Sequence, residues 1–147
     1  MIRAQTVEER LRLFLLALAA FLCLGTVVEL IFQEHYKEPM QFVPLVFSVI
    51  GVIVIAAVIF KPSRATITTL RVVMGFGVLA SLIGVYEHIE QNMGFVLDIK
   101  PNTPMADAFL ESLRGAAPLL APGLLAIIGV IAIMGTYEHP ALKKPQQ

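Results

Sequence analysis

The sequence has no tryptophan, a single cysteine and few charged residues, since Asp, Glu, Lys and Arg together make up 15% of it. The lone cysteine, Cys23, cannot form a disulfide within the chain, and we expect it to pack as a small apolar residue. The formal net charge is zero and no block of Lys or Arg occurs. This composition excludes the basic surface typical of nucleic-acid-binding proteins, so no nucleic acid is expected as a partner.

Motifs that accompany catalysis are also missing. The chain contains no nucleophile elbow, no phosphate-binding glycine loop, no HExxH and no CxxC. No charged residue lies near the middle of any apolar segment, which argues against a proton relay or an ion pump with a site at the membrane midplane. The sequence therefore favours a non-catalytic protein.

Apolar residues are abundant instead: they form 57% of the chain and give a mean hydropathy of +0.80. An ordinary soluble domain is about 45–50% apolar. Four apolar segments approach the roughly 20 residues needed to cross a hydrocarbon core, and they are residues 11–32, 42–60, 72–89 and 116–137. Backbone amides have no water partner in lipid, so such segments must be helical. The predicted fold is an all-α integral membrane protein, residues 1–147 forming one domain of four transmembrane helices.

The distribution of basic residues predicts the orientation of these helices. With four crossings, eight Lys and Arg residues lie on the side of the termini and three on the other side. The first side holds Arg3, Arg10, Arg12, Lys61, Arg64, Arg71, Lys143 and Lys144, and the second holds Lys37, Lys100 and Arg114. Because cationic loops stay in the cytoplasm, we expect both termini to be cytoplasmic, in the plasma membrane or, in a bacterium, the inner membrane.

An internal repeat is suggested by aligning residues 44–62 with residues 122–140. Seven of the nineteen aligned positions are identical, among them Gly51 with Gly129. The preceding helices align with a different shift, which pairs Arg12 with Arg71 and Gly25 with Gly84. The fold would then be two parallel-repeat helical hairpins, residues 11–62 and 70–140, related by a pseudo-two-fold axis along the membrane normal. Apolar sequence of low complexity inflates such matches, so chance similarity is the alternative.

The motif Tyr-Glu-His occurs twice, in GVYEH at residues 84–88 and in GTYEH at residues 135–139. Span counting places the two copies on opposite membrane surfaces, so they cannot jointly hold one ion, and GTYEH is interpreted as a helix end. In the first copy, His88 follows Gly77, Ser81 and Gly84 at spacings of four, three and four residues. Small residues on one helix face allow close helix packing, which predicts that His88 points into the bundle.

Ionisable side chains near the outer helix ends form a candidate metal site. Its members are Glu29, His35, Glu87, His88 and Glu90. Under the repeat alignment Glu29 is the counterpart of His88, so these two side chains are expected to converge. Carboxylate and imidazole ligands suit a divalent transition metal such as Zn, Fe, Mn or Cu(II). The alternative is that these side chains only reach interfacial water or bond to loop amides at helix ends.

The second outer loop, residues 102–115, predicts a short amphipathic helix. Thr103 is expected as its N-cap and Gly115 as its C-cap. Its apolar face consists of Met105, Phe109, Leu110 and Leu113. Such a helix would lie on the outer interface or cover the bundle, and it would offer a docking surface for a larger partner.

Together these features predict a small non-catalytic accessory or structural subunit of a larger membrane complex. It would contact the lipid bilayer and other membrane protein subunits, or associate with itself. The alternative is a metal-binding or transport protein that uses the outer Glu/His cluster. A small membrane metalloenzyme built on the same cluster is a third hypothesis.

Overall fold

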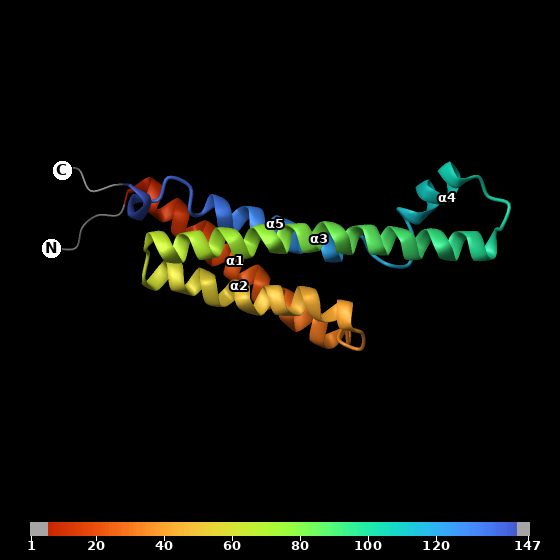
Figure 1. Ribbon diagram of the computed structural model, residues 1–147, viewed down its shortest axis with the longest axis horizontal. Helices are drawn as coiled ribbons and strands as arrows, with labels where there is room; N and C mark the ends of the chain where they lie inside the picture. Colours follow the sequence, from red (N-terminus) through yellow and green to blue (C-terminus); the bar gives the residue numbers. More distant parts are fainter. Residues whose placement is uncertain (1–5, 144–147) are drawn as a thin grey trace.

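The computed structural model describes residues 6–143, and this part of the chain is helical with no strand. Its α-helices are α1 (Val7–Phe32), α2 (Phe42–Phe60), α3 (Arg64–Ile99), α4 (Met105–Ser112) and α5 (Leu120–Met134) (Figure 1). Two short 3₁₀ helices, η1 (Pro39–Gln41) and η2 (Pro140–Leu142), precede α2 and follow α5. Arg3 and Lys144, which were counted for the orientation, lie outside the described residues.

Four of the helices form an antiparallel bundle. α1 packs against α2 and α5, and α3 packs against the same two helices, with the most extensive contact between α3 and α5. α2 and α5 lie diagonally and touch each other only sparingly. The start of α1 and the end of α5 lie at the same end of the bundle (Figure 1). We call this end the inner end. The opposite end, where the α1–α2 connection lies, is the outer end.

Three helical segments are long and apolar enough to cross a membrane: α1, η1 with α2, and α3. By length and composition the chain is a helical membrane protein, as the sequence predicts. α5 has 15 residues and is about 22 Å long at 1.5 Å per residue, shorter than a hydrocarbon core of about 30 Å. The predicted fourth span, residues 116–137, is therefore only partly helical. α5 begins at Leu120, so residues 116–119 of the predicted span lie before the helix.

α3 is much longer than the predicted span of residues 72–89. It has 36 residues, so it extends about 54 Å. It begins at a capping box in which the Ser63 and Thr66 side chains each bond to the other's backbone N–H. Its outer part projects past the α1–α2 connection and has α4 packed beside it (Figure 1). We call residues 90–114, which include this outer part of α3 and α4, the arm.

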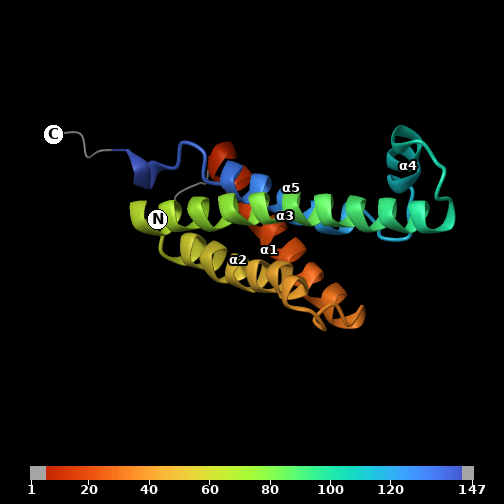
Figure 2. The same cartoon turned by 45° about the vertical axis from the view of Figure 1, so that its right-hand side comes forward.

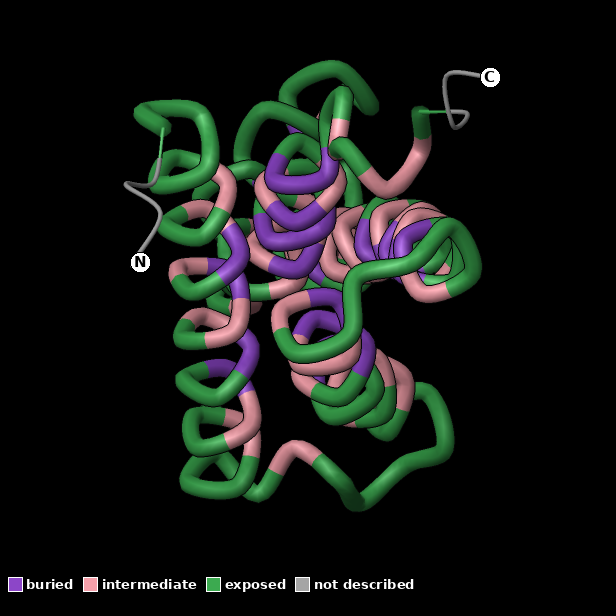
Figure 3. The backbone as a smooth tube through the Cα atoms, turned by 90° about the vertical axis from the view of Figure 1, so that its left-hand side faces the viewer, coloured by how far each residue is buried: buried purple, intermediate pink, exposed green. Residues whose placement is uncertain are grey.

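The hydrophobic core occupies the inner part of the bundle, where the buried stretches of the helices face one another (Figure 3). It consists of Leu16, Ala19, Cys23, Val54, Ile55, Val58, Ile67, Leu70, Met74, Ile128 and Ala132. Cys23 is a free, buried thiol, as expected. Gly51 and Gly129, the glycines matched in the repeat alignment, are both buried beside Met74. A Cβ at Gly129 would lie 3.0 Å from the Met74 carbonyl oxygen, so this glycine permits the close crossing of α3 and α5.

Toward the outer end the α1–α2 pair leans away from α3 (Figures 1 and 2). Gly25, near the outer end of α1, would have no atom within 4 Å of an added Cβ. Glu29, one turn further, is exposed. The alignment pairs Gly25 with Gly84, but Gly25 does not lie at a helix crossing. At this end the α1–α2 pair is therefore separated from the α3–α5 pair (Figures 1 and 2).

Candidate functional site

Two adjoining cavities open between the hairpins at the outer end of the bundle, with volumes of about 370 and 200 Å³. The larger lies between α1 and the start of α5, and the smaller lies between the start of α2 and α3. Both are lined by His35, Pro44, His88, Gln91, Pro122 and Leu125. We call this combined space the outer cleft.

Four of the five residues proposed from the sequence as metal ligands line the outer cleft. Glu29 lines the larger cavity and Glu87 the smaller, while His35 and His88 line both. Glu90 is exposed and lines neither cavity. Two residues along a helix correspond to a rotation of about 200°, so Glu90 lies almost opposite His88 on α3.

These side chains do not form a compact ligand set. Among residues 6–143, no group of three His, Cys, Asp or Glu side chains is arranged to hold a metal ion. Glu29 and His88, which were predicted to converge, line the same cavity but do not form a ligand set with a third such side chain. Metal binding by these residues stays a prediction.

His88 is oriented by a backbone carbonyl at the start of α5. Its Nδ1 lies 3.2 Å from the carbonyl oxygen of Pro118. A carbonyl oxygen can only accept, so Nδ1 carries the hydrogen in this contact. The Pro118 carbonyl is available because Pro122, four residues later, has no N–H to donate. His88 thus replaces a hydrogen bond that the proline sequence of α5 cannot make.

Ser81 joins α3 to α5 beside the cleft. Its hydroxyl donates to the Pro122 carbonyl oxygen and accepts from the Ala126 N–H at 3.1 Å. These two backbone groups are four residues apart, so the hydroxyl is inserted into the hydrogen-bond ladder of α5. Gly77 and Ser81 are buried, and a Cβ at Gly84 would lie 3.2 Å from Pro122 Cβ. A Cβ at Gly77 would lie 3.5 Å from the Phe47 ring of α2 and 4.0 Å from Leu125 of α5. The small-residue face of α3 therefore packs inside the bundle, against both α2 and α5.

Asn92 has a structural role that the sequence reasoning missed. Its Nδ2 donates to the carbonyl oxygens of Ser112 at 3.0 Å and Ala117 at 2.9 Å, and its Oδ1 accepts from the Ala117 N–H at 3.0 Å. Its position could have indicated this role, since it lies one turn beyond His88 on the same face. Asn92 fixes the connection from α4 to α5, and Ala117 in this connection lines the larger cavity.

The predicted helix of the outer loop is present as α4, but its packing differs from the expectation. Ala108 and Ser112 are its buried residues, while all four residues of the predicted apolar face are exposed. The Lys100 ammonium, at the end of α3, lies 2.8 Å from a carboxylate oxygen of Glu111. α4 therefore packs on α3 through small residues and presents its large apolar side chains outward.

The predicted caps of this helix are wrong. Pro104 is the N-cap and Leu113 the C-cap, in place of Thr103 and Gly115. Proline is tolerated at a helix start because no N–H is needed there. Gly115 instead packs on the Asn92 amide, where an added Cβ would overlap the amide group.

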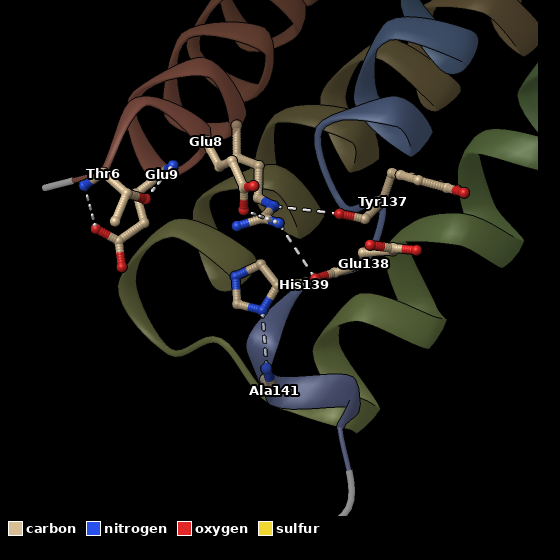
Figure 4. Close-up of polar contacts among 8 residues, drawn as sticks. Thr6, Glu8, Glu9, Tyr137, Glu138, His139 and Ala141 are labelled. Atoms are coloured by element: carbon tan, nitrogen blue, oxygen red, sulfur yellow. Dashed lines mark hydrogen bonds and ion pairs between the residues drawn. The ribbon is translucent and has the colours of Figure 1, made fainter.

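GTYEH lies at the inner end, remote from GVYEH, and directly follows α5, as its interpretation as a helix end predicts. Arg12 donates to the carbonyl oxygens of Tyr137 and Glu138, each at 3.2 Å (Figure 4). Arg71 donates to the Thr136 hydroxyl at 2.9 Å and to its carbonyl oxygen at 2.8 Å. Cations suit the carbonyl-rich end of a helix. Burial, together with the positive charges of Arg12 and Arg71, lowers the pKa of His139.

No match to this chain is found among known protein families, curated proteins or solved structures. Two features of the molecule bear on its function, the arm and the outer cleft. The arm presents apolar side chains beyond the bundle. The cleft combines carboxylates and imidazoles with apolar walls.

Proposed function

We propose that the chain is a small non-catalytic integral membrane protein that acts as an accessory or structural subunit of a larger membrane complex. The observation that carries this proposal is the exposed apolar surface of the arm. Its large apolar side chains with exposed fractions between 43 and 61% are Phe95, Ile99, Met105, Phe109, Leu110 and Leu113. Contiguous apolar surface outside lipid is typical of a protein contact site.

The arm lies beyond the apolar segment of α3, which ends near Ile89. Ten further residues of helix, up to Ile99, add about 15 Å at 1.5 Å per residue. Asp98, Lys100 and Glu111 are charged residues of the arm, and such groups are costly in hydrocarbon. Because α4 packs through small residues, its larger apolar side chains remain available to another subunit.

We further propose that the bundle crosses the membrane four times with both ends of the described chain in the cytoplasm, and that the membrane is the plasma or bacterial inner membrane. α5 and its apolar flanks together provide the fourth crossing. The return of α5 to the level where α1 starts supports an even number of crossings, and the excess of Lys and Arg at that end supports the orientation.

The two hairpins are proposed to be parallel repeats. A two-fold axis along the bundle would exchange α1 with α3 and α2 with α5. It would therefore make the α2–α3 contact equivalent to the α1–α5 contact, and both are present. The glycine pair at positions 51 and 129 supports the same relation, because both glycines are buried at helix contacts.

Purification from its native membrane in mild detergent tests the subunit proposal. We expect the wild-type chain to migrate as a complex of defined stoichiometry, and the Phe109→Ser, Leu110→Ser double variant to lose it while retaining its own expression level. Asn102→Ser, an exposed change in the loop between α3 and α4, is the matched control and should leave the complex intact. A wild-type chain that migrates alone and is fully stable would contradict the proposal.

A further inference from the structure

We propose that the outer cleft binds an organic cation with an apolar body, such as a protonated amine or a quaternary onium ion. The first support is its size. The two adjoining cavities measure about 370 and 200 Å³, and small-molecule sites in proteins occupy about 300–1,000 Å³. The space is therefore large enough for an organic molecule.

The second support is the charge of the walls. Three carboxylates line the cleft: Glu29 in the larger cavity, and Glu38 and Glu87 in the smaller. None of the described residues that line either cavity is Lys or Arg. Lys37, which neighbours Glu38 in sequence, is ion-paired with Glu34. A concave surface lined by three carboxylates and by no Lys or Arg attracts cations and disfavours anions such as phosphate headgroups.

The third support is the way in which the carboxylates are distributed. They come from α1, from the α1–α2 connection and from α3, and no three acidic or imidazole groups of the described chain are arranged to hold one ion. A metal ion requires ligands that converge at about 2 Å. An organic cation requires only one nearby carboxylate, provided that the rest of the ligand finds apolar contacts.

The walls between the carboxylates supply these contacts. Leu30 from α1, Pro44 from α2, and Pro122, Leu124 and Leu125 from α5 line the larger cavity. A hydrophobic body with a single positive charge matches this combination of groups.

Binding of tetraphenylphosphonium to the purified full chain, measured by equilibrium dialysis against protein-free micelles, tests the proposal. We expect saturable binding, and weakening by about five- to tenfold in both Glu29→Gln and Glu87→Gln, because each variant removes a charge near a low-dielectric wall. Glu90→Gln is the matched control: it removes an acid from the same outer region, but one that lines neither cavity, and it should leave the affinity unchanged.

Tetraphenylborate, an anion of nearly the same shape, separates charge recognition from simple partition into an apolar space. We expect no saturable binding of this anion to the wild-type chain. Equal binding of the two ions would overturn the proposal. So would an unchanged tetraphenylphosphonium affinity in both cleft variants, or an equal loss in Glu90→Gln. Circular dichroism of each variant shows whether its helices are intact.

Discussion

At the scale of single residues, buried polar side chains hold the outer end of the molecule together. Asn92 and Ser81 are 5% and 3% exposed, and each bonds backbone groups of the segment that leads into or forms α5. A buried polar group without a partner is costly, whereas a fully bonded one fixes a single arrangement. These residues therefore determine where the walls of the outer cleft lie.

Asn92→Ala should loosen the connection between α4 and α5. Three hydrogen bonds to Ser112 and Ala117 would be lost, and we expect a destabilisation of about 2 kcal/mol because the backbone groups lose their partner. Hydrogen–deuterium exchange of residues 112–119 should accelerate in this variant. Asn102→Ala, which changes an exposed asparagine, is the control, and identical exchange in both variants would contradict the prediction.

Sequence spacing predicted part of this residue-level detail. The face of Gly77, Ser81 and Gly84 follows from helical periodicity alone, which is a local property of the chain. The N-cap of α4 was predicted one residue too early, at Thr103 in place of Pro104. The C-cap was predicted wrongly because Gly115 packs on Asn92, which is distant in sequence. Long-range contacts of this kind have no signature in a single sequence.

At the scale of elements, the pairing of α3 with α5 determines the architecture. Gly129 lies at a close crossing of the two helices, since an added Cβ would lie 3.0 Å from the Met74 carbonyl oxygen and 2.7 Å from Val78 Cγ2. In lipid, close packing of this kind replaces the hydrophobic effect as the force that associates helices. A small residue is therefore required at the crossing.

Gly129→Ala should destabilise the bundle by about 1–3 kcal/mol, because the backbone of α3 must move to accommodate the methyl group. Gly75→Ala on α3 is the matched control, since no atom lies within 4 Å of its added Cβ. We expect this control to be neutral or stabilising by up to about 1 kcal/mol, because alanine favours helix. Unfolding in mixed detergent micelles measures the stability of both variants. Equal stabilities of Gly129→Ala and Gly75→Ala would refute the role of Gly129.

Hydropathy located the elements better than it fixed their ends. Residues 42–60 coincide with α2, and residues 11–32 differ from α1 only by its first turn. The outer end of α3 was missed because hydropathy falls after Ile89 although nothing interrupts the helix before Pro101. Hydropathy indicates which residues can lie in lipid. The ends of a helix depend in addition on capping residues and prolines, which hydropathy does not measure.

At the scale of the whole molecule, composition alone predicts a helical membrane protein, and the long apolar helices agree with it. The divergence of the two hairpins could not be predicted, because it depends on which helices touch and at what level. The outer cleft is a product of this divergence. Glu29, His35, Glu87 and His88 could be assigned to this region from the sequence because all four lie at or near the outer ends of apolar segments, which hydropathy locates.

The orientation is testable by cysteine labelling, because the chain has one cysteine and Cys23 is buried. In a Cys23→Ser background, Lys37→Cys and Asn102→Cys should react with a membrane-impermeant maleimide in intact cells. Arg64→Cys and Lys143→Cys should react only after lysis, because the proposed topology places them in the cytoplasm. Labelling of Lys143→Cys from outside, with Arg64→Cys protected, would show that α5 does not cross.

The arginine contacts at the end of α5 have a consequence for the biogenesis of the protein. Arg12 and Arg71 belong to the first helix of each hairpin, yet both bond to carbonyl groups of residues 136–138, which are synthesised later than either arginine. Until that segment has emerged from the ribosome, neither guanidinium has these partners. The contacts that tie α1 and α3 to the end of α5 can therefore form only late in synthesis, after the rest of the bundle has been made.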